Sequence, residues 1–274
     1  MDVPLLLWKT LLLRPYVFFF LAVALVAASR LLGWTRTGAL FGVTWLTAFV
    51  CEWSSTRIGF PFGDYYYTGS TVGEELYLAN VPFMDSLSFT FLLFASYSLA
   101  LWLLLPAEPG AEASGRRLLT RVGHNDRCAL LSWPVIGLTC LFFMLIDVVI
   151  DPVALRGDRW YLGLIYGYPD PGVYFGVPLA NFAGWFVVGL IAMTGYRLLD
   201  RSGLLPAFPG AVPVKDVLLG CGLYYLVLVF NLVMTFWIGE WLLGLVGCLL
   251  YVPVTALALL RLRRLSLTAF LPTS

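Results

Sequence analysis

Apolar stretches long enough to cross a lipid bilayer recur along the whole chain, and they constrain its fold more than any other feature. A membrane-spanning helix needs about 20 mainly apolar residues. Of the 274 residues, 60% are hydrophobic and 12% are charged, whereas a soluble domain carries about 25% charged residues. So few charges cannot cover a water-facing surface. The sequence therefore predicts an all-α, polytopic transmembrane helical bundle.

The apolar stretches indicate about seven spans, and no long polar linker divides them. Residues 1–274 are therefore expected to form a single membrane domain. Residues 1–15 are apolar but are interrupted by Lys9 and Arg14, so we expect an interfacial segment there. The expected spans are residues 16–32, 38–53, 82–105, 129–150, 177–198, 217–237 and 241–260.

Basic residues concentrate in alternate connections and in the C-terminal tail, residues 261–274. Lys and Arg mark the cytoplasmic side of a membrane protein. With seven spans the basic connections and the tail share one side, so the C-terminus is expected in the cytoplasm. The connections on the opposite side, residues 54–81 and 151–176, are aromatic and acidic instead.

Several classes of protein are excluded by what the chain lacks. It has one histidine, His124, and its five cysteines are scattered without CxxC spacing, so no metal site is expected. Gly220 and Gly222 are not followed by the third glycine of a dinucleotide fingerprint. The lysines are Lys9 and Lys215, neither in the last span, which excludes a retinal Schiff base. A net charge of +1 does not favour a nucleic-acid partner. We expect no cofactor.

Ionisable and amide side chains inside the predicted spans are candidate functional groups. A charged residue in a span costs about 2.5–3.5 kcal/mol on insertion scales, so it is rarely present without a role. In the predicted topology these side chains approach the same membrane face, the one that carries the aromatic connections. They are Glu52, Asp85, Asp147, Asp151 and Asn181.

Asp147 and Asp151 are four residues apart and so share one helix face. Two neighbouring carboxyls in an apolar setting cannot both ionise cheaply, so one is expected to keep its proton and to serve as a general acid. Structural roles compete with this interpretation. Asp151 precedes Pro152 and could end a helix, and Glu52 could pair with Arg57. The spacing also resembles half of a prenyltransferase motif, but the chain has no convincing second Asp-rich motif.

Three segments together resemble the integral-membrane carotenoid 1,2-hydratases. The first is Glu52 followed by GFPFGDYYYT at residues 59–68. The second is DVVIDP at 147–152, followed by Gly157 and Trp160. The third, and the most specific, is YFGVPLANFAGW at 174–185. The resemblance covers residues 52–185 and implies an integral protein of a prokaryotic cell membrane.

The resemblance implies carotenoid biosynthesis, by addition of water across the terminal C1′=C2′ double bond of an acyclic (ψ) carotenoid end. An acid protonates the less substituted carbon, and water captures the tertiary cation. The expected partners are thus a lipid-soluble carotenoid, water and the bilayer. The chemistry needs a desolvated acid, a base that holds the water and aromatic faces near the cation.

Roles are assigned to the residues as hypotheses. Asp147 or Asp151 is the proton donor, and Glu52 or Asp64 positions or deprotonates the water. Asn181 orients one of the carboxyl groups. Residues expected to bind the substrate are Tyr65, Tyr67, Asp85, Trp160, Tyr174 and Trp185.

Two other functions remain open at this point. A membrane lycopene cyclase protonates the same ψ end but closes a ring instead of admitting water. A proton-coupled transporter also carries acids inside its spans, although transporters often contain internal repeats and none is visible here. The mass of the product separates hydration from cyclisation, because hydration adds one water.

Overall fold

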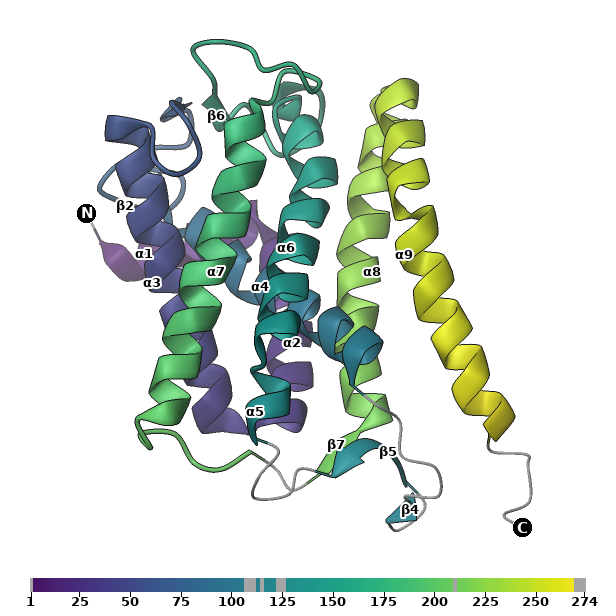
Figure 1. Ribbon diagram of the computed structural model, residues 1–274. Coiled ribbons are helices and arrows are strands. Elements are labelled where there is room, and N and C mark those ends of the chain that lie inside the picture. The colour runs from purple at the N-terminus through teal and green to yellow at the C-terminus, as the bar shows by residue number, and fades with distance from the viewer. Residues whose placement is uncertain (1, 106–111, 114–115, 122–126, 209–210, 269–274) are drawn as a thin grey trace.

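The computed structural model describes residues 2–105, 112–113, 116–121, 127–208 and 211–268. Long helices run along a common direction (Figure 1), as the apolar pattern predicted. The helices are α1 (Val3–Leu13), α2 (Pro15–Leu32), α3 (Trp34–Ile58), α4 (Phe83–Leu104), α5 (Arg127–Leu130), α6 (Trp133–Ala154), η1 (Gly157–Arg159), α7 (Leu179–Arg201), α8 (Val214–Trp237) and α9 (Trp241–Thr268). The strands are β1 (Tyr66–Tyr67), β2 (Tyr77–Leu78), β3 (Val81–Pro82), β4 (Glu112–Ala113), β5 (Arg116–Arg121), β6 (Tyr166–Gly167) and β7 (Ala211–Pro213).

Helices α2, α4, α6, α7, α8 and α9 are long and apolar enough to cross a membrane. With the more polar α3, which has 25 residues, they form a helical bundle of about seven spans, and this confirms the prediction. Helix α1 has 11 residues, which is too short to span a bilayer.

Several element boundaries differ from the sequence prediction. Helix α3 extends beyond the predicted 38–53 at both ends because its polar ends find partners. Near its start, Arg36 is buried, donates to Asp200 at 2.5 Å and lies over the ring of Phe208. Helix α6 passes through Pro152 to Ala154, so Asp151 lies in the helix and not in the following loop. Helix α9 continues to Thr268, into the segment predicted as a tail.

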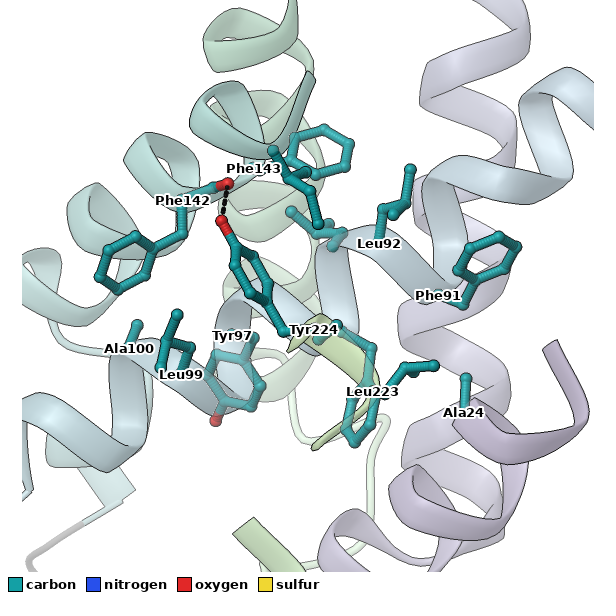
Figure 2. Close-up of a cluster of buried hydrophobic side chains, with 14 of the residues drawn as sticks. Ala24, Phe91, Leu92, Tyr97, Leu99, Ala100, Phe142, Phe143, Leu223 and Tyr224 are labelled. Carbon is teal, nitrogen blue, oxygen red and sulfur yellow. Dashed lines mark hydrogen bonds between the residues drawn. The ribbon is translucent and has the colours of Figure 1, made fainter. Parts of the chain in front are cut away.

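Helix α4 lies at the centre of the bundle and contacts α2, α3, α6, α8 and α9. Figure 2 shows Phe91 and Leu92 of α4 near Leu223 of α8 in the buried apolar core. Tyr224 of α8 donates its hydroxyl to the main-chain oxygen of Phe142 in α6, at 2.9 Å. The Tyr224 hydroxyl also lies 2.7 Å from the Tyr251 hydroxyl, so the buried group is satisfied, as a low-dielectric core requires.

Two loops, residues 59–82 and 155–178, lie at the same end of the bundle. They are joined by antiparallel pairing of β1 with β6 (Figure 1). The Thr68 hydroxyl donates to the main-chain oxygen of Leu164 at 2.6 Å. Strands β5 and β7 pair at the opposite end, where the described chain also ends. The paired loops therefore cover one end of the bundle.

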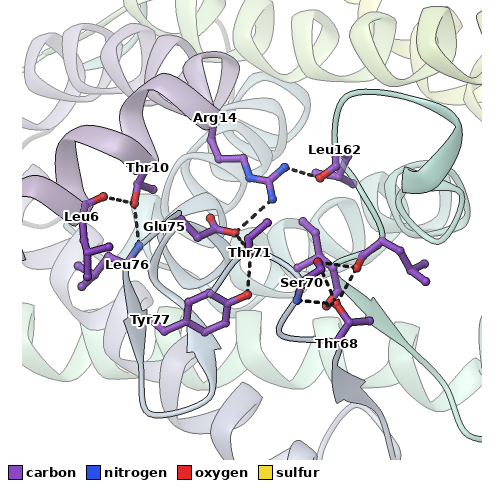
Figure 3. A network of polar contacts seen from close by, with 12 residues as sticks. Leu6, Thr10, Arg14, Thr68, Ser70, Thr71, Glu75, Leu76, Tyr77 and Leu162 are labelled. Atoms are coloured by element: carbon purple, nitrogen blue, oxygen red, sulfur yellow. Dashed lines mark hydrogen bonds and ion pairs between the residues drawn. The ribbon is translucent and has the colours of Figure 1, made fainter. Parts of the chain in front are cut away.

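A buried ion pair connects the beginning of α2 to both loops (Figure 3). The Arg14 guanidinium lies 3.2 Å from a carboxylate oxygen of Glu75 and donates to the main-chain oxygen of Leu162 at 2.5 Å. Both charged side chains are fully buried. Thr10 of α1 adds a further link, because its hydroxyl accepts the main-chain N–H of Leu76 at 2.8 Å. These contacts hold the loops over the interior of the bundle.

Candidate active site

A cavity of about 160 Å³ lies beneath the paired loops, between helices α2, α3, α4, α6, α7 and α8. Most of its lining is apolar and aromatic. Its carboxyl groups lie on two walls: α6 and α7 form one, and α3 and α4 form the other. The carboxyl and carboxamide groups at the two walls are Glu52, Asp85, Asp147, Asp151 and Asn181, and Asn231 of α8 adds a further carboxamide to the lining.

On the first wall one amide bridges two carboxyl groups. Asn181 lies in the first turn of α7, which begins after Pro178. Its side-chain nitrogen donates to Asp147 Oδ2 at 2.7 Å and to Asp151 Oδ2 at 3.1 Å. The two aspartates belong to successive turns of α6, so one carboxamide reaches both.

The two aspartates differ in the number of hydrogen bonds that they accept. Asp151 also accepts from the hydroxyl groups of Tyr166 and Tyr168, the latter at 2.7 Å. Asp147 accepts only from Asn181, and its buried Oδ1 has no hydrogen-bond partner among the described residues. Hydrogen bonds donated to a carboxylate favour its charged form. The surroundings therefore suit a charged Asp151 better than a charged Asp147.

The second wall contains Glu52 of α3 with Asp85 and Ser88 in the first two turns of α4. Glu52 accepts from the Ser86 hydroxyl through one oxygen and from the Tyr67 hydroxyl, at 3.0 Å, through the other. Each carboxylate oxygen can accept a further hydrogen bond. This wall therefore offers acceptors to a small polar molecule in the cavity.

Tyrosine side chains from the two loops lie between the walls. The Tyr65 hydroxyl lies 3.4 Å from that of Tyr67, and the Tyr65 ring packs edge-on against Tyr166. Burial raises the pKa of Tyr65 and Tyr67 well above the usual tyrosine value, and the nearby Glu52 carboxylate raises both further. These hydroxyls therefore keep their protons and stay hydrogen-bond donors at neutral pH.

An aromatic cluster forms the floor of the site, one helical turn below Asp147 and Asn181. The Trp185 ring stacks on Phe89 with centroids 4.1 Å apart, and its centroid lies 4.7 Å from that of Phe143. Such rings bury a large apolar area in a fixed geometry. The floor beneath the polar groups is thus apolar and aromatic.

The residues predicted from the sequence fall into two groups. Asp64 is exposed and lies next to Gly59, outside the cavity. Tyr174 packs against Phe175 and Phe182, also outside the cavity. The residues that do line the cavity are Glu52, Tyr65, Tyr67, Asp85, Asp147, Asp151, Trp160, Asn181 and Trp185.

Sequence reasoning did not select Tyr166 and Tyr168 as site residues, although they donate to Asp151. Because these tyrosines are two residues apart, both side chains lie on one face of an extended segment. Tyr65 and Tyr67 have the same spacing in the other loop, and this pair of patterns was the signal available. Among the described residues, no group of three or more His, Cys, Asp or Glu side chains is arranged to hold a metal ion.

Comparisons with known proteins agree on one family. The family described as "Carotenoid biosynthesis protein" matches residues 13–254. The chain is similar to bisanhydrobacterioruberin hydratase from Haloarcula japonica, with 31% identity over 170 residues. That alignment covers 62% of this chain and 48% of the relative, so it spans about half the relative's length. No solved structure matches the chain.

Proposed function

The chain belongs to the carotenoid biosynthesis protein family, and from that premise we propose that it is a carotenoid 1,2-hydratase. It would add water across the terminal C1′=C2′ double bond of a ψ end and form a tertiary alcohol. The name of the Haloarcula relative supports a hydratase. The observation that carries the proposal is the pair of carboxyl-bearing walls that face one apolar cavity beneath the loops.

The size of the cavity suits the end of an isoprenoid chain. An apolar protein cavity of about 150 Å³ holds a benzene molecule, and this cavity measures about 160 Å³. It therefore has room for a terminal isoprene unit with water beside the polar walls, but not for a whole carotenoid. The proposed substrate inserts one end only.

Asp147 is the proton donor in this proposal. Its Oδ1 is buried without a hydrogen-bond partner among the described residues, which favours a protonated carboxyl group over a charged one. The Asp147 proton passes to C2′, a C–H bond forms, and positive charge develops on C1′. Asp151 stays charged through the hydrogen bonds from Tyr166, Tyr168 and Asn181, and its charge stabilises the cation electrostatically.

The opposite wall holds the water. Asp85 and Ser88 line the cavity beside Glu52, and we assign Glu52 as the acceptor of the water's proton. The water oxygen bonds to C1′ while one water O–H bond breaks toward the Glu52 carboxylate. The proton then returns to the Asp147 carboxylate before the next turnover, so the net reaction adds one water. This scheme uses only the chain's own acid and base groups, and no cofactor.

The orientation of the chain is part of the proposal. Arg36 and Arg201 lie at the end of the bundle opposite the paired loops, as does the C-terminal end of α9. Since basic residues favour the cytoplasmic side, we assign that end to the cytoplasm of a prokaryotic cell and the paired loops to the other side. Labelling of a single introduced cysteine in each loop, from outside intact cells, tests this assignment.

Expression in a bacterium that makes lycopene tests the function. The expected product is a hydroxylated carotenoid that is heavier than lycopene by one water. A product of unchanged mass with a closed ring would instead establish the cyclase. Unaltered pigment, together with proton-coupled transport by the purified chain in proteoliposomes, would establish the transporter. Asp147→Asn should lose the product, whereas Asp170→Asn, a change in an exposed loop carboxylate, is the matched control.

A further inference from the structure

Two aromatic side chains stand in the wall of the cavity between α2 and α8. Tyr16 of α2 and Phe230 of α8 both line the cavity, and both are partly exposed. Their rings stack with centroids 5.4 Å apart and planes 19° from parallel. The neighbouring Phe19 and Val229 are 56% and 54% exposed, so in a bilayer this side of α2 and α8 faces lipid. The two stacked rings therefore lie in the wall between the cavity and that side.

Helices α2 and α8 lie wholly within the described residues, and no hydrogen bond joins them. By contrast, polar side chains tie other pairs of helices together: Asn181 joins α7 to α6, and Arg36 joins α3 to α7. Apolar packing alone can open by rotation of side chains without leaving buried polar groups unpaired. The seam between α2 and α8 can therefore separate without breaking a hydrogen bond.

The seam is lined by flat aromatic surfaces. Trp160 and Tyr161 of the loop 155–178 pack against Tyr16, with ring centroids 6.5 and 5.6 Å away. Deeper in the cavity, Phe20 and Val227 continue the lining from the same two helices. Aromatic rings favour offset or edge-on contact with other π-systems. A conjugated, planar polyene has the chemistry that such a surface binds.

We propose that the seam between α2 and α8 is the binding subsite for the conjugated chain next to the reacting end. This inference rests on the substrate class of the proposed function. The polyene parts Tyr16 from Phe230, its terminal unit reaches the two carboxyl walls, and the remainder of the chain stays in the bilayer. The substrate thus reaches the site sideways from the lipid and not through the loops.

Photo-cross-linking tests the subsite without requiring turnover. A benzophenone side chain replaces Phe230 in full-length protein that also carries Asp147→Asn, so the carotenoid is bound but not converted. The matched control replaces the neighbouring Val229, which is 54% exposed on the lipid-facing side of α8 and does not line the cavity. After illumination in lycopene-containing membranes, pigment attached to the protein band is measured by its visible absorbance.

The expected result is severalfold more attached pigment at position 230 than at position 229. Equal labelling at the two positions would mean only dissolved carotenoid around the bundle, and would overturn the subsite. The pair Tyr16 and Phe19 on α2 gives an independent arm, since Phe19 is 56% exposed and lies outside the cavity lining. If the α8 variant does not accumulate, the comparison of positions 16 and 19 tests the subsite instead.

Failure of the subsite and failure of the proposed function give different results. Hydration by the unmodified protein with no excess labelling at position 230 or position 16 would refute the subsite alone. Excess labelling at those positions, with no hydrated product from the unmodified protein, would refute the hydratase and leave the polyene subsite standing. Phe230→Ala adds a kinetic readout: KM for the carotenoid should rise while kcat changes little, because in this proposal the ring holds the polyene and takes no part in proton transfer.

Discussion

Replacing either aspartate of the first wall by asparagine should lower hydration activity, but the two variants should differ in thermal stability. In Asp147→Asn the new side chain still accepts the hydrogen bond from Asn181, which is 2.7 Å long in the native chain, so the fold should be retained. The proposed proton donor is lost, however. General acid catalysis contributes about 10²–10⁴-fold in rate, which corresponds to about 3–5 kcal/mol in the barrier. Hydration should therefore fall by about that factor with little change in thermal stability.

Asp151→Asn should behave differently because this side chain accepts hydrogen bonds from three donors: Tyr166, Tyr168 and Asn181. The substitution removes the charge and brings an N–H₂ group against these donors. Hydrogen bonds to charged groups contribute about 1.5–3 kcal/mol each, so a loss of stability of about that size should accompany the loss of activity. The midpoint of thermal unfolding in detergent should fall for this variant and stay near the native value for Asp147→Asn.

The assay is the ratio of hydrated to unconverted carotenoid in lycopene-producing cells, normalised to the amount of protein in the membrane. Asp170→Asn supplies the control for a lost exposed carboxylate. Full hydration activity in Asp147→Asn would refute the assignment of the proton donor. Full activity in both Asp147→Asn and Asp151→Asn would refute acid catalysis by this wall altogether.

Three further outcomes follow from the fold and the second wall. Glu52→Gln should lower hydration much more than Asp64→Asn, because Glu52 lines the cavity and Asp64 is exposed; the same product ratio measures it, and equal losses would contradict the choice of base. Arg14→Ala should destabilise the protein by about 3–5 kcal/mol, because it leaves the fully buried Glu75 unpaired; an unchanged unfolding midpoint would contradict this. Gly184→Ala should lower the free energy of unfolding by about 1–3 kcal/mol, because a Cβ there would lie 2.5 Å from an aromatic ring carbon of the loop 59–82. An unchanged free energy of unfolding would mean that the loop can move away from the new methyl group.

The sequence was sufficient for the architecture because each span is decided locally, by the transfer of about 20 residues from water to lipid. The span predicted for α3 is too short, because a charged Arg36 indicates a helix end when only the sequence is considered. In the fold, α7 and the segment after it bring Asp200 and Phe208 next to Arg36. The true length of α3 depends on contacts that are more than 160 residues away in the chain.

The sequence predicts those site residues whose side chains are ionisable, because placing such a side chain in a membrane span is energetically costly. Glu52 and Asp147 stand out from apolar surroundings, and both line the cavity. Tyr168 does not stand out, because tyrosine is common at membrane interfaces. Tyr168 and Tyr174 are the same type of residue and lie in the same loop. Only the path of the loop sends Tyr168 to Asp151 and Tyr174 to Phe182.

Under the proposed function, the small volume of the cavity has a kinetic consequence for carotenoids with two identical ends. A space of about 160 Å³ would accommodate one end at a time, while the far end would lie in the lipid beyond the reach of this pocket. Conversion of both ends would therefore require release, reversal of the long molecule in the bilayer and a second capture. Such a distributive course would make the singly hydrated carotenoid a free intermediate that accumulates early and is then consumed. It would also let other enzymes of the same membrane compete for the unreacted end.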